Sequence, residues 1–210
     1  MRVMRWWATA AGALAVSAGD VTAQSAQPIS LQVSGLYASL FGDDYEGIGK
    51  GLGGEAQLRF TPGALSVGVG GQYTRHDFTV TVPSVGDFDG NLSLAGAFIE
   101  PRFVIATGSN LVAPYISARL SLLHQGISVD FPACGEVSGS ATGTTVNGGG
   151  GLLVRLTSRM NLDAGATYGY TQFGEATIKC ESTGEELGEL AKGSGTNIVV
   201  RIGLAIGLGG

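Results

Sequence analysis

The stretch that decides the fold is NIVVRIGLAIGLG, residues 197–209. Every second residue from Ile198 to Leu208 is aliphatic, and the residues between them are mostly small or polar, with Arg201 among them. Alternation sustained over about a dozen residues predicts a β-strand well beyond the usual ~5–6 residues. Such a strand either buries its aliphatic face in a soluble core or turns that face toward lipid.

Seven earlier segments repeat the alternation, and together with the last one they predict an all-β chain. These segments are residues 30–41, 55–61, 64–76, 91–105, 113–124, 144–156 and 161–173. The connections between successive segments are alternately long and short, and segments of ~9–13 residues suit tilted membrane-spanning strands. The sequence therefore predicts an eight-stranded antiparallel up-and-down transmembrane β-barrel with short periplasmic turns and longer outer loops. The last strand is expected to close against residues 30–41.

Two strands carry irregular features. Phe78, Val80 and Val82 continue the alternation past residue 76, which indicates that the second hairpin extends beyond the membrane. Leu92 and Leu94 fall out of phase with the rest of residues 91–105, and this favours a β-bulge near Ala95.

The composition agrees with a narrow barrel. Charged residues make up 14% of the 210-residue chain, about half the usual share, and its 36 glycines follow no collagen period. A closed barrel satisfies its backbone hydrogen bonds between strands, and small inward residues suit a narrow lumen. The net charge of -5 argues against a nucleic-acid partner.

The N-terminal segment has the features of an export signal. Arg2 and Arg5 precede an apolar stretch at residues 6–18, which is too short to span a bilayer, and small residues follow up to Ala23. We expect a signal peptide at residues 1–23, a short leader at 24–29 and the barrel at 30–210; the alternative is a short N-terminal anchor helix. Elsewhere no apolar run approaches ~18 residues, so no transmembrane helix is expected.

Charged side chains within the predicted strands fall on the face opposite the aliphatic residues. An arginine turned to lipid at mid-bilayer would cost roughly 2–4 kcal/mol, whereas opposite charges in a lumen can pair. The sequence thus predicts a lumen charge network, basic overall, inside a barrel with acidic outer loops. It either holds the barrel together as structural filler or acts as the selectivity element of a small pore. Its predicted members are Glu55, Arg59, Glu100, Arg102, Arg119, Arg155, Asp163 and Arg201.

Cys134 and Cys180 lie in two of the predicted long outer loops. An even number of cysteines in an exported chain favours a disulfide, and two cysteines allow one intramolecular pairing. We expect a Cys134–Cys180 bond.

No motif predicts a catalytic, cofactor or metal site. Residues 47–51 resemble a phosphate-binding loop only in part, because no Ser or Thr follows the lysine and no helix follows the loop. His76 and His124 lie at strand ends without a convincing nucleophile nearby. The glutamates at 181–189 are expected to form a solvated acidic loop, and Gly148–Gly151 is expected to reflect tight packing.

Three stretches resemble the eight-stranded outer-membrane barrel families, which include the OmpA transmembrane domain and the OmpX- and OmpW-like proteins. They are FIEPRF at 98–103, APYISAR at 113–119 and LDAGATYGY at 162–170. The resemblance implies insertion by the barrel-assembly machinery. In such families the recognition signal is a polar residue, a glycine and two hydrophobic residues near the C-terminus, and Arg201, Gly203, Ile206 and Leu208 fit that spacing.

These observations predict a monomer in the lipid of a bacterial outer membrane, with no enzymatic activity. The expected role is envelope integrity or surface interaction through the outer loops. A narrow pore or small-solute channel is the alternative, and an outer-membrane lipid-modifying enzyme is a further one.

Overall fold

The computed structural model describes residues 27–82, 86–131, 135–180, 186–190 and 192–209. These residues form ten strands and one short 3-10 helix, η1 (Asp43–Tyr45). The strands are β1 (Ile29–Phe41), β2 (Gly51–Phe60), β3 (Leu65–Val82), β4 (Gly86–Val104), β5 (Val112–Phe131), β6 (Gly135–Arg155), β7 (Met160–Phe173), β8 (Ala176–Cys180), β9 (Glu186–Leu190) and β10 (Ser194–Leu208).

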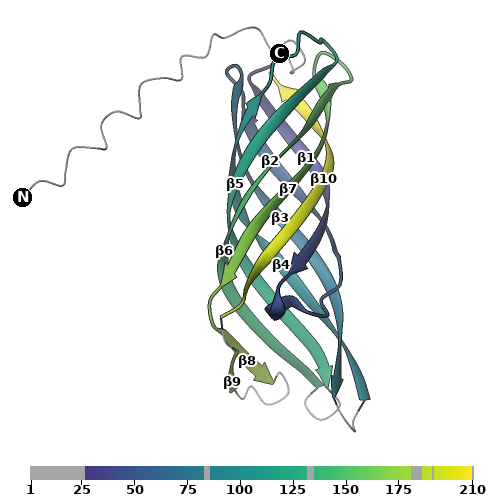
Figure 1. The fold of residues 1–210 in the computed structure, drawn as a ribbon, viewed down its shortest axis with the longest axis vertical. Coiled ribbons are helices and arrows are strands. Elements are labelled where there is room, and N and C mark those ends of the chain that lie inside the picture. The colour runs from purple at the N-terminus through teal and green to yellow at the C-terminus, as the bar shows by residue number, and fades with distance from the viewer. Residues whose placement is uncertain (1–26, 83–85, 132–134, 181–185, 191, 210) are drawn as a thin grey trace, which may run out of the picture.

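Eight of these strands close into an antiparallel up-and-down barrel (Figure 1). Around the ring the order is β1, β2, β3, β4, β5, β6, β7 and β10, and β10 pairs with β1 from Ile29↔Leu208 to Phe41↔Thr196. The all-β barrel and its predicted closure between the first and last strands are confirmed. The short connections 61–64, 105–111 and 156–159 lie at the end where β1 starts and β10 stops; we call it the turn end, and the opposite end the loop end.

The outer surface of the barrel is a band of aliphatic and aromatic side chains. Leu58, Val69 and Ile202 are 56%, 58% and 60% exposed, although each sits in the middle of a strand. An apolar surface that surrounds a molecule on all sides is unfavourable in water and is what lipid requires. Charged and polar residues alternate with this band and point inward, as the face assignment predicted.

Four strands run well past the length needed to cross a bilayer. β3 and β4 stay paired out to Val82↔Gly86, which confirms the predicted extension of that hairpin. β5 and β6 stay paired out to Phe131↔Gly135, so the prediction of a loop at residues 125–143 is wrong. Outside the membrane the outward-facing positions are polar and the inward ones remain apolar, and the resulting Gly- and Ser-rich composition resembles that of a loop. β8 and β9 form a further hairpin, and β8 pairs with β6.

The predicted bulge near Ala95 is also wrong. The β3–β4 register is unbroken from Leu65↔Phe103 to Val82↔Gly86. Leu92 and Leu94 therefore point into the barrel, and they look out of phase because the lumen is apolar at that level. The β4–β5 ladder is instead interrupted around Pro101, which has no N–H to donate.

Several predictions fall on residues outside the described ranges. The signal peptide at 1–23, most of the leader at 24–29, and Cys134 are among them, so the signal peptide and the disulfide stay predictions. β1 begins at Ile29, one residue before the predicted barrel start. Among the described residues, no helix has the length and hydropathy to span a membrane.

Candidate functional site

Seven of the eight predicted charged residues meet inside the barrel, and we refer to these seven as the lumen network. Each is at most 5% exposed, and they come from five different strands of the ring. They are Glu55, Arg59, Glu100, Arg102, Arg119, Asp163 and Arg201. Arg155, the eighth, points to the same side at the turn-end limit of β6 but is only half-buried.

Glu100 is the centre of the network. Its Oε1 accepts hydrogen bonds from Arg59 Nη2 at 2.8 Å and from Arg102 Nη2 at 2.9 Å. Its Oε2 accepts from Arg119 Nε at 2.7 Å and from Arg201 Nη1 at 2.6 Å. One carboxylate is thus shared by four guanidinium groups, which cross-links strands on all sides of the lumen.

The other two carboxylates, on Glu55 and Asp163, each contact one of the arginines that also bind Glu100. Arg119 Nη1 donates to Glu55 Oε2 at 2.6 Å. Arg102 Nη1 lies 2.9 Å from Asp163 Oδ2, and the same oxygen accepts from Gln32 Nε2 at 2.7 Å. Charge-assisted bonds of this length are among the strongest that side chains form.

Tyr115 is a member of the site that the sequence analysis did not single out. Its hydroxyl donates to Asp163 Oδ1 at 2.6 Å and accepts from Arg201 Nη2 at 3.1 Å, and its ring packs 3.9 Å from the Arg102 guanidinium carbon. A Cβ at Gly165 would collide with this hydroxyl, so glycine there makes room for the aromatic ring. The alternation along β5 could have placed Tyr115 in the lumen, because residues 115 and 119 lie on the same face of that strand.

The network carries a net positive charge. Four arginines are balanced by three carboxylates, which leaves one positive charge in excess. Charges taken out of water are stabilised only when they are paired and hydrogen-bonded, so the excess has to be met by something else in the lumen.

A second layer closes the lumen toward the loop end. Seven buried residues pack there into an apolar cluster, which we call the loop-end plug: Leu40, Tyr45, Leu92, Leu94, Leu123, Ala141 and Phe173. η1 brings Tyr45 into this cluster. Burial, and then the charge of Asp44, raise the pKa of Tyr45 to about 12. The sequence analysis missed the plug because an inward aliphatic residue gives the same pattern as a lipid-facing one.

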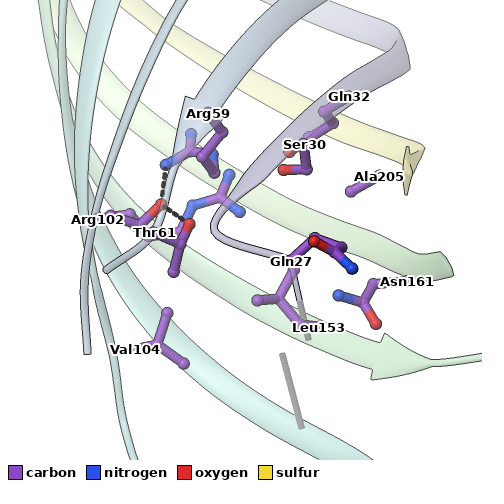
Figure 2. A pocket seen from close by; sticks show the side chains of 11 residues that line it. Gln27, Ser30, Gln32, Arg59, Thr61, Arg102, Val104, Leu153, Asn161 and Ala205 are labelled. Atoms are coloured by element: carbon purple, nitrogen blue, oxygen red, sulfur yellow. Dashed lines mark hydrogen bonds between the residues drawn. The ribbon is translucent and has the colours of Figure 1, made fainter. Parts of the chain in front are cut away.

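Two small cavities lie inside the barrel, and two larger ones lie at the loop end. One of about 30 Å³ lies between the network and the turn end (Figure 2), and another of about 30 Å³ separates the network from the plug. At the loop end, a cavity of about 440 Å³ is lined mainly by apolar residues, including Ile48, Phe78 and Ile127. A groove of about 600 Å³ beside it is lined by polar and charged residues of β3, β4 and β5, including Asp77 and Asp130.

The two histidines do not form a common site. His76 is buried, and its ring nitrogens lie 3.0 Å from the Gly49 carbonyl oxygen and 3.3 Å from Thr74 Oγ1. His124 is exposed on the outer face of β5. In the part of the chain that the structure describes, no group of three His, Cys, Asp or Glu side chains is placed to hold a metal ion.

Solved structures with similar folds are outer-membrane barrels. Neisserial surface protein A is 22% identical with a TM-score of 0.55, covering 88% of this chain and 100% of that one. Ail of Yersinia pestis, solved with the heparin analogue sucrose octasulfate, is 17% identical with a TM-score of 0.50, covering 85% and 96%. OprG of Pseudomonas aeruginosa is 13% identical with a TM-score of 0.54, covering 89% and 98%.

At these identities the structures establish the fold alone. A comparison with curated protein sequences gives no match. The family described as outer membrane protein beta-barrel domain, however, matches residues 8–204, nearly the whole chain. With its lipid-facing band, closed ring and charged lumen, the chain belongs to the outer membrane protein beta-barrel domain family, whose place is the bacterial outer membrane.

Proposed function

We propose that this protein is a non-conducting outer-membrane barrel that acts by binding partners at its loop end, on the cell surface. The observation that carries the proposal is the contrast in cavity volume along the barrel axis. Two cavities inside the barrel are about 30 Å³ each, whereas two loop-end cavities are about 440 and 600 Å³. The protein has room for a ligand outside the membrane and little room for solute flow through it.

The lumen network supports the part of the proposal that describes the barrel as non-conducting. Because Glu100 is held by arginines from β2, β4, β5 and β10, opening a passage would require several buried ion pairs to separate. Breaking a buried pair without replacement costs about 3–5 kcal/mol. The network therefore acts as a cross-link that holds the cylinder closed and rigid.

The loop end favours a partner that carries positive charge. Acidic side chains outnumber basic ones among its described residues; the acids are Asp43, Asp44, Glu46, Asp77, Asp87, Asp89, Asp130, Glu136 and Glu175, and the bases are Lys50, Arg75, Lys179 and Lys192. The Ail structure holds a polyanion, but the charge of this chain disfavours one. β3 to β6 extend beyond the other strands of the ring at the loop end (Figure 1), and they carry Asp77, Asp87, Asp89, Asp130 and Glu136 of these acids.

Planar-bilayer recording of the refolded protein tests the closed lumen. We expect no discrete current steps; steps of uniform size would overturn the proposal in favour of the narrow pore. Binding to the loop end is tested with an arginine-rich peptide and with heparin against protein in lipid nanodiscs. We expect the peptide to bind and heparin not to bind.

The matched variant for the binding test is Asp77→Asn combined with Asp89→Asn and Asp130→Asn. These residues line the 600 Å³ groove. Peptide binding should weaken in the triple variant, while its heat-modifiable mobility on gels should stay that of the folded wild type. Equal binding by the wild type and the triple variant would contradict the role of this surface.

A further inference from the structure

The cavity between the lumen network and the turn end is lined by cations and by no anion. Among its described lining residues are Arg59 and Arg102, together with the hydroxyl-bearing Ser30, Thr61 and Ser66 (Figure 2). None of the described lining residues is an aspartate or a glutamate. The charged side chains that line this cavity are therefore all cationic.

Both arginines that line this cavity keep an unused donor, as Arg119 and Arg201 of the network also do. Arg59 and Arg102 are 5% and 1% exposed, and the Nε atom of each has no hydrogen-bond partner among the described residues. A buried donor on a charged group is costly to leave unsatisfied, and such groups in native proteins are met by ordered water or by an ion.

Two arginines of the network, Arg59 and Arg201, contact no carboxylate other than Glu100, and of these two only Arg59 lines this cavity. Arg119 and Arg102 each contact a second carboxylate besides Glu100, on Glu55 and on Asp163 respectively. Arg201 donates to both oxygens of Glu100 and to the Tyr115 hydroxyl, whereas Arg59 donates to one Glu100 carboxylate oxygen. Its other acceptors are neutral: the side chains of Gln57 and Ser66, and the Glu100 carbonyl.

The cavity has the right size for a small occupant. Its volume of about 30 Å³ exceeds the ~10–15 Å³ that one water requires. Gln32 Oε1, an acceptor that also lies at this cavity, has no partner among the described residues. An anion would accept hydrogen bonds from the two arginines, and a water beside it would donate to Gln32 Oε1. One anion and one water would therefore fill the cavity and satisfy these unpaired polar atoms.

We propose that this cavity binds one small monovalent anion, of the size of chloride, between the guanidinium groups of Arg59 and Arg102. The anion neutralises the one excess positive charge of the lumen network. The site is separate from the loop end, so it does not depend on what the protein binds there. Current steps in a bilayer would overturn the proposed function and leave this site untouched.

Crystals grown with bromide in place of chloride test occupancy directly. We expect an anomalous peak in the cavity, within hydrogen-bond distance of both guanidinium groups. The same peak should be absent in crystals of Arg59→Gln, which lacks the excess charge. Density for water alone in the wild type at the same bromide concentration would overturn the proposal.

Stability measurements test whether the anion matters to the fold. Unfolding of the refolded barrel is followed in chloride and in gluconate, an anion too large for the cavity, at constant ionic strength. The unfolding equilibrium constant should fall about tenfold when chloride reaches about ten times its dissociation constant. No difference between chloride and gluconate would overturn the proposal.

Ser30→Asp places a carboxylate in the cavity and should make stability independent of chloride, because it supplies the missing negative charge internally. Arg75→Gln is the matched control, since Arg75 is exposed at the loop end, and it should keep the full chloride response. A chloride response retained in Ser30→Asp would count against the site. If Ser30→Asp does not refold, the bromide comparison of the wild type with Arg59→Gln still decides the question.

Discussion

Glu100 and Arg201 lie on strands diametrically opposite in the ring, and their side chains meet in the middle of the lumen with Oε2 and Nη1 2.6 Å apart. β4 and β10 are four strands apart in either direction around the barrel. A direct contact across this diameter shows that the lumen at this level is filled by side chains. Stability and closure of the barrel therefore depend on the same carboxylate.

Replacing that carboxylate should be severely destabilising. Glu100→Gln keeps the size of the side chain but removes the negative charge that four guanidinium groups share and replaces one acceptor oxygen with an NH2 donor, and the expected loss is about 3–5 kcal/mol. Equilibrium unfolding in urea from lipid bilayers measures it. Glu46→Gln, an exposed loop carboxylate, is the matched control and should stay within ~0.5 kcal/mol of the wild type. Equal midpoints for the two variants would refute the central role of Glu100.

The loop-end plug should contribute as a core does. Leu92 is fully buried in it, so Leu92→Ala is expected to cost about 2–5 kcal/mol. Leu52→Ala makes the same deletion at a residue that is 68% exposed, and its cost should be clearly smaller. The same unfolding assay compares the two, and a larger loss at Leu52 would contradict the inward position of Leu92.

The lipid-facing side should show a dependence on depth. Ile202 pairs with Gly35 at the middle of β1, whereas Leu208 pairs with Ile29 at the turn end. Ile202→Arg should cost roughly 2–4 kcal/mol and Leu208→Arg about 0–1 kcal/mol, because the charge lies at the bilayer midplane in the first and near the interface in the second. Similar costs for both would mean that β10 does not cross the membrane as described.

Alkaline pH should loosen the plug. Burial raises the pKa of Tyr45 from its ordinary value near 10 to about 12, so the folded state holds this proton more tightly than the unfolded state. The stabilisation is complete below about pH 10 and is lost as the pH rises toward about 12. Ultraviolet titration of tyrosinate should show a late component that is smaller by one tyrosine in Tyr45→Phe. A Tyr45→Phe titration curve that overlays the wild type would exclude this assignment.

The predicted Cys134–Cys180 disulfide is open to a direct test. Cys180 is buried at the end of β8, and its backbone pairs with Val137, three residues after Cys134. Peptide mapping without reductant should yield a linked pair of peptides that separates on reduction. Alkylation of either cysteine before reduction would refute the bond.

The sequence predicted the barrel well because side chains along a strand alternate between the lipid and the lumen, and this alternation can be seen in the order of residue types. In a closed sheet one residue in two faces lipid, and a charge such as Arg201 can be placed inside without any knowledge of its partner. The alternation does not show which side chain an inward residue contacts, since that contact depends on how far neighbouring strands are shifted relative to one another around the ring. The convergence of four arginines on Glu100, and the part played by Tyr115, could therefore not be predicted.

The predictions from residue type were wrong where a strand passes from one environment into another. Leu92 and Leu94 were interpreted against a polar lumen, but the lumen is apolar at the plug, and a bulge was predicted in its place. Residues 125–143 were interpreted as a loop because outward positions in water need no aliphatic side chains. Both errors arise from applying one pattern of inside and outside to strands that pass through three environments.

The extension of β3 to β6 beyond the ring has a topological consequence. Beyond Gly51, which is the loop-end limit of β2, the residues of β3 from Phe78 to Val82 pair with β4 alone, and at the far side β9 pairs with β8 alone, within the described residues. The cylinder thus opens into a sheet with two edges once it leaves the membrane. Unpaired edges can accept an added strand from another chain. Among the described residues, backbone pairing is complete where the barrel meets lipid, and unpaired strand edges lie where the sheet leaves the membrane at the loop end.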